Sequence, residues 1–120
     1  MSGEWVLKPE DLDPRMVDLV TALNEISDVF TYSSCGGHEP KQHPYQNDAG
    51  TFHVSMDIEH TQDGWAALDL IARAIDECFI DECKLSAWYD GGIRWSLEGR
   101  RWADPDMLAA AIRRLLSLRT

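Results

Sequence analysis

The segment TFHVSMDI, residues 51–58, alternates apolar and polar side chains more regularly than any other part of the chain. In an extended strand, alternate residues point to opposite sides, so its apolar and polar residues fall on separate faces. The apolar set is Phe52, Val54, Met56 and Ile58, and the polar set is His53, Ser55 and Asp57. A strand of this kind belongs to an antiparallel sheet with one face on a core and the other in water.

Three helices and three further strands are predicted around this segment. Helices are expected over residues 14–26, 63–79 and 105–116, two of them preceded by an Asp-Pro start signal. Strands are expected over residues 29–35 and on either side of the turn Asp90-Gly91-Gly92. The chain of 120 residues is long enough for one core, so we expect a single domain, residues 1–120. The element order predicts an α+β fold with helices packed on one mostly antiparallel sheet of about four strands.

Apolar residues recur at helical spacing in all three predicted helices, and each set is expected to face the core. The sets are Met16, Leu19, Val20, Leu23 and Ile26, then Trp65, Leu68, Ile71, Ala72, Ile75 and Phe79, and finally Leu108, Ala111, Ile112, Leu115 and Leu116.

Charge and cysteine content exclude several classes of function. The chain carries 21 acidic and 11 basic residues, and its net charge of -10 disfavours generic nucleic-acid binding. No apolar run approaches the roughly 20 residues that span a bilayer, and the first residues lack a signal-peptide pattern. We therefore expect a soluble, cytoplasmic protein with no membrane contact. Its three cysteines, an odd number, are expected to be free thiols.

Reactive side chains gather in SSCGGHEPKQHP, residues 33–44. Cys35 ends a predicted strand and opens a connection of about 15 residues, a length typical of functional loops. A histidine beside Cys35 would make it a nucleophile or a metal ligand, whereas a buried Cys35 would only fill space. We expect Cys35, His38 and His53 to be the reactive groups of a site. The residues expected to shape it and hold a cofactor are Ser33, Ser34, Gly36 and Gly37.

A zinc site is the less favoured interpretation of the same cluster. Cys35, His38 and His43 have sulfur and nitrogen atoms at close spacing, and His53 or His60 would supply a fourth ligand. Known zinc signatures use two well-separated pairs, and the sequence offers only one.

Three further groups have simpler explanations. Cys78 and Cys83 lie among acidic residues that raise a thiol pKa, so we expect them to be structural. The polar side of residues 51–58 is expected to be an ordinary solvent face. Aromatic and basic residues near the C-terminus would either pack the core or stack a nucleobase: Trp88, Tyr89, Trp95, Trp102, Arg94, Arg100 and Arg101.

Two segments resemble the third wybutosine-synthesis protein family of S-adenosylmethionine-dependent tRNA methyltransferases. They are ALNEISDVFTYSSCGGH and TFHVSMDIEHTQDGWAALDLIARAIDECFI, and the resemblance covers roughly residues 20 to 80. It depends mainly on Ser33, Ser34, Cys35, Gly37 and His53. His38 stands where the family has arginine, and Gly36 where it has serine. The resemblance implies a shared fold, a site at this strand end and S-adenosylmethionine as the cofactor.

The sequence is compatible with more than one function. The protein is either an enzyme of the kind that the resemblance implies or a non-enzymatic module that binds a small molecule or a protein partner. A regulatory thiol at Cys35 is a third interpretation.

Overall fold

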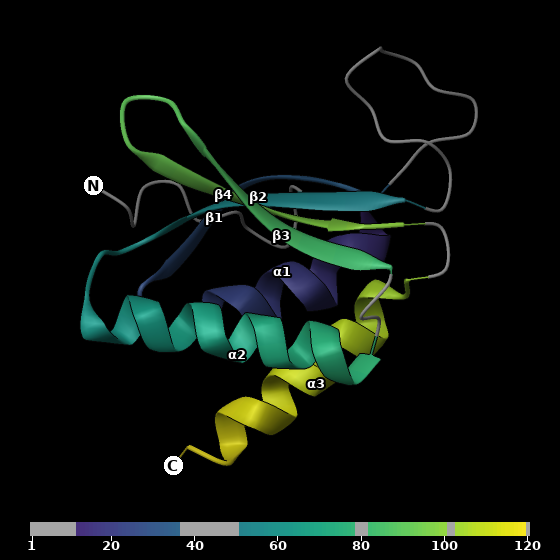
Figure 1. Ribbon diagram of the computed structural model, residues 1–120. Coiled ribbons are helices and arrows are strands. Elements are labelled where there is room, and N and C mark those ends of the chain that lie inside the picture. Colours follow the sequence, from purple (N-terminus) through teal and green to yellow (C-terminus); the bar gives the residue numbers. More distant parts are fainter. Residues whose placement is uncertain (1–11, 37–50, 79–81, 101–102, 120) are drawn as a thin grey trace.

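A computed structural model describes residues 12–36, 51–78, 82–100 and 103–119. Within these ranges, helices pack on one antiparallel sheet of four strands, which confirms the α+β prediction (Figure 1). The elements, in chain order, are the 3-10 turn η3 (Pro14–Met16), α1 (Val17–Asn24), β1 (Val29–Cys35), β2 (Phe52–Ile58), α2 (Gln62–Cys78), β3 (Cys83–Tyr89), β4 (Ile93–Gly99) and α3 (Pro105–Ser117). A helix followed by two strands therefore occurs twice before the closing helix.

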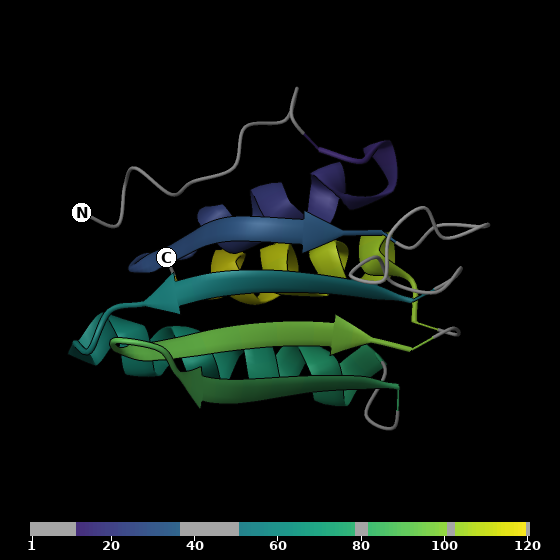
Figure 2. The same ribbon diagram turned by 90° about the horizontal axis from the view of Figure 1, so that it is seen from above.

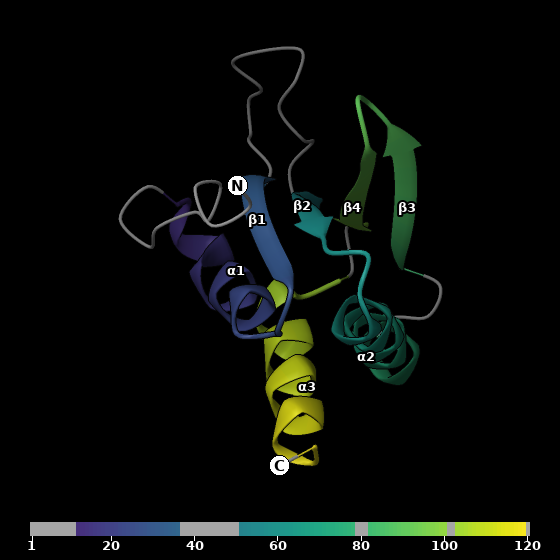
Figure 3. The same cartoon turned by 90° about the vertical axis from the view of Figure 1, so that its left-hand side faces the viewer.

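The strand order is β1-β2-β4-β3, with every neighbouring pair antiparallel. β2 and β4 are thus the central strands, and α2 connects β2 to the edge strand β3. Figure 2 looks straight at the sheet and shows the helices behind it. Seen from the end of the strands in Figure 3, all three helices lie on one side of the sheet.

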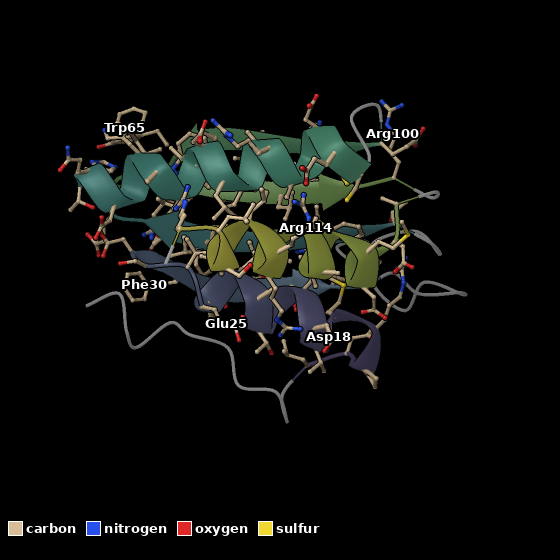
Figure 4. All side chains as sticks on the ribbon, turned by 90° about the horizontal axis from the view of Figure 1, so that it is seen from below. Asp18, Glu25, Phe30, Trp65, Arg100 and Arg114 are labelled. Carbon is tan, nitrogen blue, oxygen red and sulfur yellow. The ribbon has the colours of Figure 1, made fainter. Side chains whose placement is uncertain are left out.

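The core fills the space between the sheet and this helical layer. Its sheet side includes the apolar set of β2, which is almost completely buried, as the alternation predicts. α3 packs against both α1 and α2 and lies between them in Figure 4. Ion pairs at the surface join α3 to its neighbours: Arg113 contacts Glu25, and Arg114 contacts Glu77.

The two Asp-Pro signals mark helix starts, as predicted. The side chain of Asp104 accepts a hydrogen bond of 2.9 Å from the backbone N–H of Asp106 in the first turn of α3. Asp13 accepts one of 3.1 Å from Arg15 at the start of η3. All five predicted core residues of the first helical region are buried.

The prediction for the buried face of α2 is wrong in part. Trp65 is 71% exposed and Ala72 is also exposed, while Phe79 lies outside the described residues. The buried residues are Gly64, Ala67, Leu70, Ile71, Ala74 and Ile75. The physical reason is close approach, since small residues line this face. A Cβ atom on Gly64 would lie 1.7 Å from the carbonyl oxygen of Glu59, so only glycine fits at this contact.

In the described ranges, no helix has the length and apolar character needed to cross a membrane.

Candidate functional site

No described helix covers the face of the sheet opposite the helices (Figure 2). The strand register places polar residues from all four strands on this open face. On β2 this open face presents His53, Ser55 and Asp57, which are half-buried, while the residues between them are buried. Because directly paired residues of antiparallel strands point to the same face, the strand register identifies their neighbours.

A β-bulge in β1 decides which of its side chains reach the open face. Val29 and Thr31 are buried and pair with Ile58 and Met56 of the core face. A regular strand would direct Ser33 and Cys35 to the core as well, because alternate residues share a face. The register shifts between Thr31 and Ser33, however, so that one extra residue is accommodated. Ser33 and Cys35 consequently lie on the open face.

The start of the bulge is fixed by the last residue of α1. The side-chain oxygen Oδ1 of Asn24 accepts hydrogen bonds of 3.0 Å from both the backbone N–H and the hydroxyl of Thr31. Thr31 is fully buried. A helix end thus holds β1 at the point where its alternation changes.

The row nearest the end of β1 contains four chemically different groups. In register across the sheet, Cys35 pairs with His53, His53 with Glu98, and Glu98 with Lys84. Paired residues have Cβ atoms about 4.5–5.5 Å apart, which is close enough for direct side-chain contact. Lys84 and Glu98 form an ion pair of 3.3 Å. We call these four residues the histidine row.

Burial lowers the pKa of His53 below its usual value of 6.5, and the negative charge of Glu98 opposes part of this shift. His53 is therefore a neutral imidazole at pH 7, with one ring nitrogen able to accept a proton. A thiol-bearing residue lies on one side of it and a carboxylate-bearing residue on the other. This combination can take up, orient or pass on a proton.

Next to the histidine row lies a row of four serines, Ser33, Ser55, Ser96 and Ser86, one from each strand. Each hydroxyl can donate one hydrogen bond and accept others. Ser96 is buried and the other three serines are half-buried, so the hydroxyls that reach the surface here come from Ser33, Ser55 and Ser86. We call these four residues the serine row.

The third row combines an ion pair with aromatic rings. Nη1 of Arg94 donates a hydrogen bond of 2.6 Å to Asp57, and the Arg94 guanidinium lies 5.7 Å from the centre of the Tyr32 ring. Trp88 pairs with Arg94 in register and is 41% exposed. The carboxylate of Asp57 raises the pKa of Arg94, and burial raises the pKa of Tyr32, so Tyr32 stays neutral and Arg94 stays charged at pH 7. Tyr32, Asp57, Arg94 and Trp88 form the arginine row.

The strand ends that flank residues 37–50 are held by Arg15. A single nitrogen of its guanidinium, Nη1, donates to the carbonyls of Gly36, at 2.5 Å, and of Thr51, at 3.2 Å. Gly36 also packs so closely on Asp13 that a Cβ atom would lie 2.8 Å from a carboxylate oxygen. Gly36 is thus explained by close packing.

Some predicted site residues are brought together and others are not. Cys35 and His53 lie opposite each other, as expected from their positions at one end of two strands. Ser34 pairs with Val54 and therefore lies on the helix side of the sheet, away from Ser33 and Cys35. Gly37, His38 and His43 lie outside the described residues, and with them most of the predicted zinc site. Within the described ranges, no cluster of three His, Cys, Asp or Glu residues is arranged to hold a metal ion.

Cys35, Cys78 and Cys83 are not joined by disulfide bonds, as predicted. Cys83 is buried, and burial raises its pKa to about 11, with smaller contributions from Cys78 and Glu82. Burial, followed by Glu77, also raises the pKa of Cys78. The predicted direction is confirmed, but desolvation has a larger effect than the neighbouring acids.

The aromatic and basic residues near the C-terminus do not form one cluster. Trp88 and Arg94 lie on the open face, whereas Trp95 pairs with Met56 and Ala87 on the helix side. Arg101 and Trp102 lie outside the described residues.

The sequence-based prediction included Trp88 and Arg94 as stacking candidates but missed Tyr32 and the polar residues of β3 and β4, which are Lys84, Ser86, Ser96 and Glu98. Ser96 and Glu98 alternate with apolar residues along β4, and this alternation is the one signal that could have identified them. Their positions beside β2 depend on register, which the sequence alone does not specify.

No protein-family model matches the chain, and no curated protein or solved structure is similar enough to count as a match.

Proposed function

We propose that the open face binds a small ligand that has a planar ring and a polar tail, and that Cys35 and His53 contact its reactive part. The observation that carries this proposal is the in-register placement of Cys35, His53 and Glu98 on three adjacent strands. S-adenosylmethionine is the first ligand to test, because the resemblance of residues 20 to 80 implies it.

The chemistry of the three rows suits such a ligand. Aromatic and guanidinium planes in the arginine row can stack an adenine ring. The serine row offers hydroxyls to ribose and amino-acid groups, and the acidic protein favours the positive sulfonium. From Asp57 to His53 the strand advances by about 13 Å, a length suited to a nucleoside with an extended tail.

In this proposal His53 acts as a general base. S-adenosylmethionine would supply an electrophilic methyl group and, once its S–CH3 bond breaks, leave as S-adenosylhomocysteine. Neutral His53 would accept the proton released by the substrate nucleophile. Glu98 would stabilise the resulting imidazolium, since its carboxylate already favours the protonated form of His53. Cys35 would contact the same substrate from β1.

The test is thermal unfolding with and without 1 mM S-adenosylmethionine, with adenosine as a control that lacks the sulfonium and the amino-acid tail. A ligand that binds only the folded state stabilises it, and each 1 kcal/mol raises the melting temperature by about 3–5 °C for a domain of this size. Trp88→Ala and His53→Gln should reduce the shift. Arg73→Gln, on the solvent side of α2, is the matched control and should keep it. No shift in the wild-type protein, or equal shifts in all variants, would contradict the proposal.

A protein-binding module is the second candidate, favoured by the exposed apolar side chains at the tip of the β3–β4 hairpin. Tyr89, which is 79% exposed, and Ile93, which is 44% exposed, pair in register on one face of the hairpin, whereas Trp88 lies on the other face. Exposed apolar groups that gather in one place often mark a protein contact. If a second copy binds there, sedimentation should show a concentration-dependent dimer that Tyr89→Lys dissociates. A monomer at all concentrations would count against this self-association.

A further inference from the structure

A separate apolar pocket lies on the helix side of the sheet, between the start of α2 and the β3–β4 hairpin. It has a volume of about 180 Å³, and its main walls are Ile58, Trp65, Leu68, Ile93 and Trp95. Trp95 and Ile93 come from β4, whereas Trp65 and Leu68 come from α2. We call this the hairpin pocket.

Trp65, whose exposure was unexpected, lines the hairpin pocket. This residue was predicted to face the core, but it is 71% exposed and lies at one end of α2 in Figure 4. Ile93, across the mouth, is 44% exposed. Two large apolar side chains therefore border an apolar hollow.

The pocket is preformed by the contacts that anchor the start of α2. Gly64 packs directly on the carbonyl of Glu59, and its N–H donates a hydrogen bond of 3.0 Å to the hydroxyl of Thr61. The Thr61 hydroxyl donates in turn to the carboxylate of Asp28. Because these contacts already hold the wall, a ligand would lose little free energy in ordering it.

We propose that the hairpin pocket binds one compact, uncharged aromatic ring. A cavity of about 150 Å³ lined by apolar side chains accepts benzene, whereas pockets for drug-sized molecules occupy about 300–1,000 Å³. The size therefore excludes a nucleoside and suits a ring no larger than indole. The walls present almost no polar atoms. Glu59 and His60 also line the pocket and are exposed, and the carboxylate of Glu59 disfavours an anionic ring.

This pocket is independent of the site on the open face. Its tryptophans, Trp65 and Trp95, lie on the opposite side of the sheet from Trp88. The indole N–H signals of these three residues, assigned by single Trp→Phe replacements, can therefore report on the two sites separately.

The test is titration of the ¹⁵N-labelled full chain with indole, followed by two-dimensional NMR. We expect saturable shifts of the Trp65 and Trp95 signals with a dissociation constant of about 1 mM or tighter, while Trp88 stays unchanged. Leu68→Trp fills the hollow and should weaken binding at least about tenfold. Met107→Trp is the matched control, because Met107 lies on α3 and is 54% exposed.

Shifts that do not saturate, that centre on Trp88, or that persist unchanged in Leu68→Trp would overturn the proposal. If Leu68→Trp does not fold, Ile93→Trp at the rim provides the same test. A bound indole that S-adenosylmethionine displaces would also contradict the independence of the two sites.

Discussion

Replacing Asn24 by alanine removes the acceptor that Thr31 shares between its backbone N–H and its hydroxyl. Both hydrogen bonds measure 3.0 Å, and Thr31 is fully buried, so Asn24→Ala takes this acceptor from two buried donors. A buried donor that loses its acceptor costs about 1–3 kcal/mol. Alanine is a better helix former than asparagine by up to about 0.7 kcal/mol, which offsets part of the loss. After this offset, we expect Asn24→Ala to lower the free energy of unfolding by about 1–2 kcal/mol.

Urea unfolding followed by circular dichroism measures this change. With a typical slope of about 1–3 kcal/mol per molar, the midpoint should fall by about 1 M. Asn24→Asp keeps the acceptor oxygen and should lose less stability. Glu25→Ala, at the neighbouring exposed position, should change the free energy by less than about 0.5 kcal/mol.

The same variant tests whether the bulge orients the site. If Asn24 fixes β1 where its alternation changes, then Asn24→Ala should shift the NMR signals of His53, which pairs with Cys35 beyond the bulge. Equal stability of Asn24→Ala and Glu25→Ala would refute the reasoning from the hydrogen bonds. Unchanged His53 signals in a destabilised variant would refute the link to the site.

Three further predictions concern single side chains. Because the pKa of His53 is lowered in the folded state, the unfolded chain binds the proton first as the pH falls. The contribution of His53 to the free energy of unfolding should therefore be constant above about pH 7 and decrease as the pH drops through 6.5. His53→Gln should weaken this decrease, as measured by urea unfolding between about pH 7.5 and 5.5. Equal pH dependence of both proteins would contradict the assignment. Gly64→Ala should lower the free energy of unfolding by about 1–3 kcal/mol through its clash with Glu59, whereas Gly92→Ala, with open space around it, should be nearly neutral. At pH 8 iodoacetamide should alkylate Cys83 at least about a hundredfold more slowly than free cysteine, because the raised pKa leaves little thiolate. Mass spectrometry of the peptides measures this rate, and a rate within about tenfold of that of free cysteine would argue against the raised pKa.

Most of the fold could be predicted because its signals are local. The alternation of residues 51–58 identifies the buried side of β2, and Asp13 and Asp104, each followed by proline, mark the helix starts. The buried face of α2 could not be predicted in full. Hydrophobicity favours Trp65 at the core, whereas the close approach of α2 to the chain at Glu59 requires Gly64 there.

Only those site residues could be predicted that lie at the ends of strands recognisable in the sequence. The positions of Cys35 and His53 at one end of two strands suggested that they lie together. Regular alternation, however, would have placed Cys35 in the core with Thr31. The bulge that moves Cys35 to the open face leaves no local pattern in the sequence. Glu98 reaches His53 through pairing of β2 with β4, which are far apart in the chain.

The repeated order of one helix and two strands divides the sheet into two hairpin halves that meet only between β2 and β4. Cys35 and His53 belong to the first half, and Glu98 and Lys84 to the second. The residues of the proposed open-face site therefore lie on both sides of the boundary between β2 and β4, and neither half of the chain holds all of them. A ligand that contacts all three rows would bind residues of both halves at once. Its binding would therefore stabilise the contact between the halves, and a variant that weakens this contact would also weaken ligand binding.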